Sequence, residues 1–128
     1  MSEKEIIDHW KKGAQEAIGA ARVLCEKGFY ESALFHCHLA IEKALKALYM
    51  EQHGEDHPFS HDLAHLAELL EHHLAGNDMS ALQELSEFVV DARYSDPYWA
   101  AEQATADNAR RWIQTTEHLL ASLLDNAS

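Results

Sequence analysis

The spacing of apolar residues along the chain predicts helices throughout. In the first predicted helix, about residues 3–27, apolar side chains recur every three or four positions, which places them on one stripe. That stripe consists of Ile7, Trp10, Ala14, Ala17, Ala21 and Leu24. Gly28 then ends the helix. No segment alternates with period two over the length of a strand, so a sheet is not expected.

The second predicted helix, about residues 30–52, is apolar over more than one face. Its main stripe is formed by Leu34, Cys37, Ile41, Ala44, Leu45 and Leu48. Phe35, Leu39 and Tyr49 extend the apolar arc well beyond that stripe. A helix that is apolar nearly all round is normally enclosed by other elements. We therefore expect this helix at the centre of the fold, with two of its surfaces covered.

Three further helices complete the predicted architecture. Ser60 is placed to cap a helix over about residues 60–75, and Gly76-Asn77-Asp78 separates it from a shorter helix over about 80–92. Asp96 before Pro97 predicts the start of a last helix that runs to about Leu124. The apolar stripe of that helix is Ala101, Thr105, Ala109, Trp112, Thr116, Leu119 and Leu123. The sequence thus predicts an all-α, largely antiparallel up-and-down bundle of five helices, three long and two shorter, in a single domain over residues 1–128.

Charge and cysteine usage narrow the classes of function. The formal net charge is −12, and the few lysines and arginines are spread along the chain. Such a chain repels phosphate backbones, so nucleic-acid binding would need a basic partner or a very local site. Cys25 and Cys37 form no Cys-x-x-Cys motif and indicate a reducing compartment, for which the cytoplasm is the simplest choice. We find no apolar run of the length that export or membrane spanning needs.

The ten histidines raise the question of metal binding. One helical face of the third predicted helix carries His61, His65, Glu68 and His72, and neutral imidazoles at i and i+4 can share a zinc ion. The apolar stripe of that helix lies on the opposite side, so this face is expected to point to solvent. No Glu stands three residues before any histidine, which argues against a di-iron bundle. We expect no metal site and no cofactor.

Three absent features argue against an independent metabolic enzyme. The chain has no Gly-x-Ser-x-Gly elbow and no glycine-rich phosphate loop, and neither cysteine has an evident activating base. The stretch 40–48 is apolar apart from its charged residues, which therefore need an explanation. Glu42 and Lys46 have the i,i+4 spacing of an ion pair, which taken alone indicates helix support on an exposed strip.

Several segments, taken in order, resemble the HEPN family (higher eukaryotes and prokaryotes nucleotide-binding). They are Gly28-Phe29-Tyr30 with Ala33, the stretch from Phe35 to Leu48, His61-Asp62-Leu63, and Ala92-Arg93-Tyr94. The order and spacing of these segments carry the resemblance. It implies a five-helix bundle, commonly a homodimer, often encoded beside a minimal nucleotidyltransferase as one half of a two-component, toxin–antitoxin-like pair.

The resemblance also implies a binding site for a nucleotide, an RNA or the partner protein. We expect it at Glu42, Lys43, Lys46, His61, Arg93 and Tyr94. In this hypothesis Arg93 meets a phosphate, and Tyr94 stacks or donates a hydrogen bond. The charges of the second helix would face a polar cleft shared with the Arg-Tyr corner.

Two alternatives remain open. Family members that act as metal-independent ribonucleases carry an Arg followed, after four to six residues, by a His, whereas Arg93 is followed at those distances by Tyr98, Trp99 and Ala100. Arg111 and His118 match the spacing but lie deep in the last helix, where we interpret the match as coincidence. No catalytic residue is therefore assigned, and a ribonuclease toxin would need an unusual acid/base group. The other alternative is a structural module that dimerises through Phe35 and Leu39 and binds no ligand.

Overall fold

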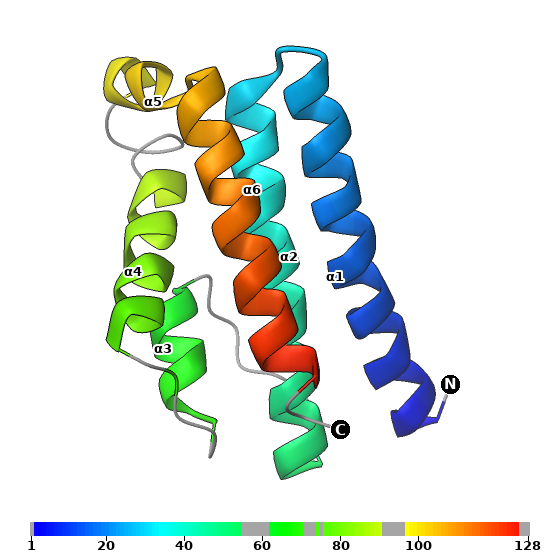
Figure 1. Cartoon of the computed structure of the whole chain (residues 1–128). Coiled ribbons are helices and arrows are strands. Elements are labelled where there is room, and N and C mark those ends of the chain that lie inside the picture. The colour runs from blue at the N-terminus through cyan, green and yellow to red at the C-terminus, as the bar shows by residue number, and fades with distance from the viewer. Residues whose placement is uncertain (1, 55–61, 71–73, 75, 91–96, 126–128) are drawn as a thin grey trace.

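All regular structure in the described part of the chain is helical (Figure 1). The computed structural model describes residues 2–54, 62–70, 74, 76–90 and 97–125. Its elements are α1 (Glu3–Glu26), α2 (Tyr30–His53), α3 (Leu63–Glu68), α4 (Gly76–Val90), α5 (Pro97–Gln103), α6 (Ala106–Leu120) and a turn of π-helix, η2 (Ala121–Asp125). The predicted all-α fold class is confirmed, with six α-helices in these residues where five were expected. None of the described helices is long and apolar enough to span a membrane.

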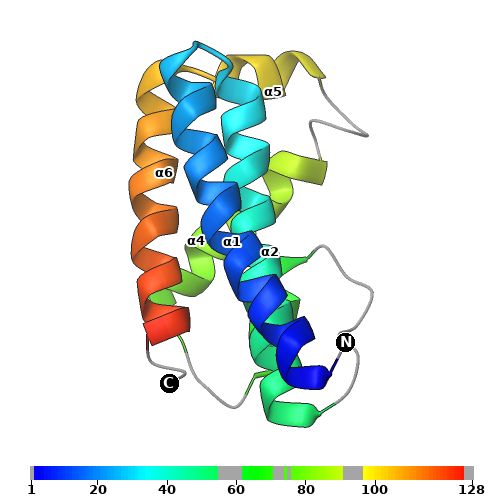
Figure 2. The ribbon, with the colours of Figure 1, turned by 90° about the vertical axis from the view of Figure 1, so that its right-hand side faces the viewer.

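Helices α1 and α2 form an antiparallel hairpin (Figures 1 and 2). The Ser2 hydroxyl caps the start of α1 by accepting a hydrogen bond from the Glu5 backbone N–H at 3.2 Å. At the other end Gly28 adopts a φ of 84°, a left-handed conformation that glycine enters without the penalty of a Cβ. The chain therefore reverses within the few residues that separate the two helices.

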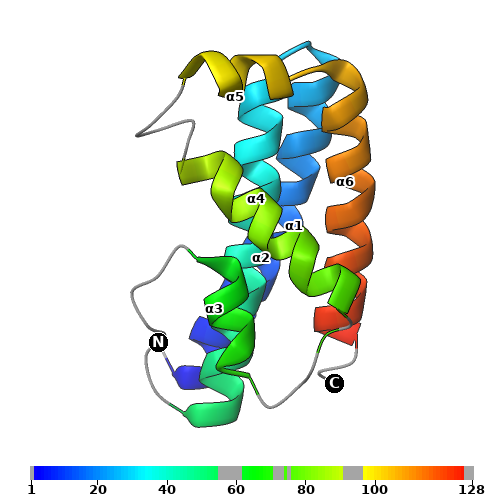
Figure 3. The ribbon, with the colours of Figure 1, turned by 90° about the vertical axis from the view of Figure 1, so that its left-hand side faces the viewer.

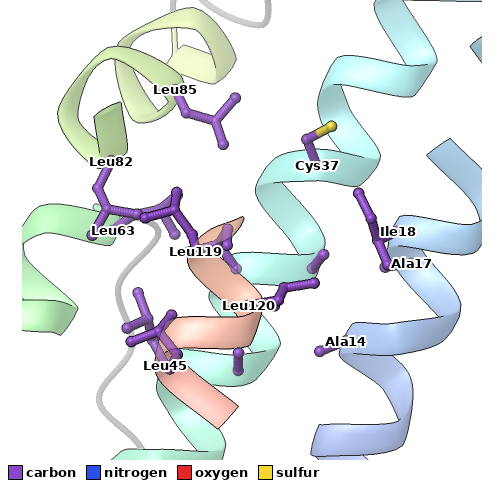
Figure 4. Packing of buried hydrophobic residues seen from close by; sticks show 14 of the residues in the cluster. Ala14, Ala17, Ile18, Cys37, Leu45, Leu63, Leu82, Leu85, Leu119 and Leu120 are labelled. Carbon is purple, nitrogen blue, oxygen red and sulfur yellow. The ribbon is translucent and has the colours of Figure 1, made fainter. Parts of the chain in front are cut away.

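Helix α2 lies at the centre of the fold. Thirteen of its 24 residues are buried, and their positions cover every side of the helix. Figure 1 shows α2 behind α6, with α1 on one side and α3 and α4 on the other. Side chains from all these helices converge on it, among them Ile18 of α1, Leu63 of α3 and Leu119 of α6 (Figure 4). This placement confirms what the apolar pattern predicted.

The last predicted helix is divided in two. Thr105, which fits the apolar stripe, is instead extended at φ −105° and ψ 162°, and its Oγ1 accepts a hydrogen bond from the Asn108 backbone N–H at 3.2 Å. The Asn108 side-chain amide also donates to the Gln103 carbonyl at 2.9 Å. The first bond caps the start of α6, and the second supplies a donor to a carbonyl at the end of α5. Short polar side chains can end a helix in this way, because they compete with the helix for its backbone N–H and C=O groups. Helix α5 consequently lies across one end of the bundle (Figures 2 and 3).

The boundaries of α3 and α4 also differ from expectation. The cap of α3 is Asp62, whose Oδ1 accepts from the His65 backbone N–H at 3.1 Å, and Ser60 lies outside the described residues. Gly76, expected as a stop, is the first residue of α4. The Leu63 N–H donates to the Ser86 hydroxyl at 2.9 Å, so the start of α3 is fixed to the middle of α4.

Candidate functional site

The ion pair between Glu42 and Lys46 is enclosed by the fold. The Lys46 Nζ lies 3.6 Å from Glu42 Oε2. The Glu42 side chain is only 9% exposed and the Lys46 side chain only 8%. The predicted pair therefore forms, but the expectation of an exposed strip was wrong, because neighbouring helices cover this part of α2. Removing charges from water costs several kcal/mol per ion, and pairing offsets that cost only in part. A pair buried here needs an explanation beyond helix support.

Helix α1 supplies an aromatic neighbour for this pair. The Lys46 Nζ lies 5.8 Å from the centre of the Trp10 ring, within the range of a cation–π interaction. The sequence pattern placed Trp10 only on the core-facing stripe of α1. In the structure it is partly buried and packs beside Ile7 and Met50. Trp10 thus belongs to the apolar stripe of α1 and also lies beside the charged side chain of Lys46.

Lys43 lies directly against the backbone of α1 at Gly13. A Cβ built on Gly13 would lie 3.1 Å from Cδ and 3.2 Å from Nζ of Lys43, which is closer than ordinary contact. Glycine in a helix interior costs about 1 kcal/mol relative to alanine. An alanine at this position would require the flexible end of the Lys43 side chain to shift by a few tenths of an ångström. Sequence reasoning missed this contact, because nothing along the chain marks Gly13 as the neighbour of residue 43.

A hollow of about 90 Å³ is lined by His9, Trp10 and Lys43. Lys46 is neutralised by Glu42, whereas Lys43 forms no ion pair or hydrogen bond with any described residue. Lys43 is therefore a cation without an ionic partner among the described residues, and it lines a hollow together with the aromatic ring of Trp10. Such an arrangement suits an anionic group attached to a planar ring. We call the set His9, Trp10, Lys43, Glu42 and Lys46 the α1–α2 site.

The structure brings together only part of the predicted site. Glu42, Lys43 and Lys46 lie on neighbouring turns of α2 and belong to the α1–α2 site. His61, Arg93 and Tyr94 lie outside the described residues. The cleft that these three were expected to share with α2 stays a prediction.

The histidine face of α3 shows no sign of a metal centre in the part that is described. His65 and Glu68 are exposed, while His61 and His72 lie outside the described residues. Among residues 2–54, 62–70, 74, 76–90 and 97–125, no three His, Cys, Asp or Glu side chains are grouped so that they could hold a metal ion.

Arg111 and His118 both connect α6 to α4. Arg111 Nη2 lies 3.7 Å from Glu84 Oε1, and His118 Nε2 lies 3.8 Å from Asp78 Oδ1. Their spacing of seven residues puts them on one side of α6, where α4 supplies an acidic partner for each. A role in helix pairing accounts for the Arg–His spacing without catalysis.

The two cysteines are free, and Cys37 is buried in the core. Burial raises the pKa of the Cys37 thiol to about 11, and the Thr116 hydroxyl acts against this rise. At neutral pH the thiol is protonated and therefore a poor nucleophile. This agrees with the absence of an activating base in the sequence around it.

Comparison with known proteins identifies the family. The sequence matches the family model of the HEPN domain over residues 7–126. The chain belongs to the HEPN domain family. The match covers nearly the whole bundle, from the first buried residue of α1 to the end of η2. The family resemblance found in the sequence is thus confirmed.

Two solved structures share the HEPN fold with this chain. TT1696 from Thermus thermophilus superimposes with a TM-score of 0.83 at 21% identity, covering 95% of this chain and 98% of that one. ST0689, described as an archaeal HEPN homologue, gives a TM-score of 0.80 at 24% identity, with both chains covered completely. At such identities the likeness establishes the fold alone. No curated protein matches the sequence significantly.

Proposed function

We propose that this HEPN domain acts by binding, as the partner of a minimal nucleotidyltransferase in a two-component system, and that its α1–α2 site takes the phosphate of a nucleotide. Family membership supports the first part of this proposal. The observation that carries the second is Lys43, a cation without a partner among the described residues, held against Gly13 beside the Trp10 ring. Lys43 would neutralise phosphate, and Trp10 would offer its edge or face to the base.

The buried pair on α2 supports the same site. Glu42 fixes the position of Lys46, and Lys46 in turn lies under Trp10. The pair therefore orients the aromatic wall while adding no net charge. Lys43 remains as the group that attracts an anion, in a protein whose overall charge of −12 repels anions elsewhere.

A protein partner fits the remaining surface better than RNA does. The large apolar side chains that stay most exposed among the described residues are Val23, Phe29 and Tyr98. They belong to the end of α1, the α1–α2 turn and α5, which lie at the same end of the bundle (Figure 1). Apolar side chains exposed at one end of a bundle are available for a protein–protein contact, whereas the acidic charge disfavours a nucleic-acid backbone. The two free thiols are consistent with a cytoplasmic location.

Equilibrium titration with ATP and with inorganic phosphate tests the nucleotide site. We expect saturable binding of ATP, weakened at least about fivefold in Lys43→Gln, as loss of one charge-assisted contact requires. Lys12→Gln removes an exposed lysine of the same helix pair and is the matched control. Equal loss in both variants, or no binding at all, would contradict the proposed site.

Co-purification tests the partner. The proposed partner, a minimal nucleotidyltransferase, is co-expressed with the chain, and a complex is expected that Tyr98→Ser or Phe29→Ser weakens. Sedimentation of the chain alone then measures whether it forms the expected homodimer. Co-purification that these substitutions leave unchanged would exclude this end of the bundle as the contact.

A further inference from the structure

A second pocket lies between α4 and α6, where α5 meets α6. Its floor is formed by the buried side chains Leu34, Phe88 and Trp112, and its rim by Glu84, Glu87, Gln103 and Asn108. The cavity measures about 60 Å³. None of its lining residues belongs to the α1–α2 site. The pocket therefore needs a ligand chemistry of its own.

The polar groups on the rim are mainly hydrogen-bond acceptors. Glu87 forms no ion pair or hydrogen bond with any described residue, so its carboxylate is available. Asn108 already uses its amide nitrogen on the Gln103 carbonyl, at 2.9 Å, which leaves its side-chain oxygen as the group that can accept. An occupant must consequently bring donors and positive charge.

A planar cation of the chain itself lies beside two of the residues that line this pocket, Trp112 and Glu84. The guanidinium carbon of Arg111 lies 5.2 Å from the centre of the Trp112 ring, and its Nη2 lies 3.7 Å from Glu84 Oε1. An aromatic ring with a carboxylate beside it is the combination that holds guanidinium groups. The Trp112 ring lines the pocket together with a second carboxylate, that of Glu87, which lies one helical turn beyond Glu84.

We propose that this pocket binds the guanidinium group of an arginine-bearing ligand, with the cation between Glu87 and the part of the Trp112 side chain that lines the pocket. A guanidinium group is flat, carries five N–H donors and stacks on aromatic rings. A lysine ammonium presents a compact charge with three donors and gains less from the ring. The ligand is either an arginine side chain of a polypeptide or a free arginine-derived amine.

NMR titration of the intact chain tests this proposal. The probes are N-acetyl-arginine methylamide, N-acetyl-lysine methylamide and agmatine, and the readout is the indole N–H resonance of Trp112 with the backbone amide of Glu87. We expect saturable shifts, with the arginine compound bound at least about threefold more tightly than the lysine compound. Tighter binding of agmatine identifies a free amine as the ligand, and tighter binding of the blocked arginine identifies a polypeptide side chain.

Two variants separate the pocket from general attraction of cations to an acidic protein. Glu87→Gln removes the free carboxylate and should weaken the arginine compound about threefold to tenfold. Glu102→Gln removes an exposed carboxylate of α5 that does not line the pocket and should leave binding unchanged. Because both side chains are exposed, both variants should keep the far-UV circular dichroism of the parent. Absent shifts, equal binding of the lysine compound, or equal loss in both variants would overturn the proposal.

Discussion

An ion pair lies at the α1–α2 contact, between two residues of α2, and another joins α4 to α6. The two pairs differ in how far their side chains are buried. At α1–α2 the Glu42 and Lys46 side chains are almost completely covered, and Trp10 lies over the cation. At α4–α6 the pair between Arg111 and Glu84 is more than half exposed. Exposed pairs contribute about 1 kcal/mol or less, whereas breaking a buried pair leaves a charge that the fold cannot solvate. The comparison indicates that the buried pair restricts which side chains can occupy positions 42 and 46, whereas the exposed pair places no such restriction on positions 84 and 111.

The largest expected effect is from the removal of one partner of the buried pair. Glu42→Ala leaves the Lys46 charge enclosed and unpaired, and should lower the free energy of unfolding by about 3–5 kcal/mol. Urea denaturation followed by circular dichroism measures the change. A loss below about 1 kcal/mol would mean that Lys46 reaches water and that the two contacts do not differ in kind.

The buried thiol of Cys37, between α2 and α6, should make the stability of the fold depend on pH. The Cys37 pKa is raised from 9.0 to about 11, so well below pH 9 the thiol is protonated in both folded and unfolded chains. Between these values the unfolded chain releases the proton more readily, and stability falls as pH rises. About 2–3 kcal/mol should be lost by pH 11. The Cys37→Ala variant should lack this component, so identical pH profiles for the two proteins would refute the assignment.

Glycine substitutions in α1 probe how closely α2 approaches. A Cβ at Gly19 meets nothing within 4 Å, so Gly19→Ala should stabilise the protein by about 0.5–1 kcal/mol through helix propensity. Gly13→Ala gains the same propensity but displaces the flexible end of Lys43. It should therefore weaken ATP binding, whereas Gly19→Ala should not. Thermal unfolding and ATP titration of both variants measure the two effects.

The smallest effect belongs to the exposed contact. Arg111→Ala should change the free energy of unfolding by less than about 1 kcal/mol, because its pair with Glu84 is solvated. Urea denaturation at low and high salt checks this value and its screening. A loss as large as that of Glu42→Ala would erase the difference between the two contacts.

Much of the fold could be predicted because the signals are local. The position of α2 followed from its apolar residues on every side, and the grouping of Glu42, Lys43 and Lys46 followed from their spacing on one helix. Thr105 misled the prediction because its methyl group fits an apolar stripe, while its hydroxyl also suits a helix cap. Gly76 was equally ambiguous, as glycine occurs at both ends of helices.

The parts of the site that come from α1 could not be predicted. Trp10 of the site and Gly13 next to it meet α2 only through tertiary packing, and neither sequence spacing nor composition shows which faces of two helices touch. Within α1, Trp10 looks like any other member of the apolar stripe. The contributions of His61, Arg93 and Tyr94 remain predictions of the family resemblance.

The central claim is that the buried pair on α2 serves ligand binding, and that an apolar pair of similar size in its place would stabilise the fold equally well. Replacing it with apolar residues of similar size, Glu42→Met together with Lys46→Met, tests this directly, since such exchanges are often neutral or stabilising. ATP titration and urea denaturation of this double variant are the measurement. We expect a folded protein of equal or greater stability whose ATP affinity is lost, and unchanged ATP affinity in the double variant would contradict the claim.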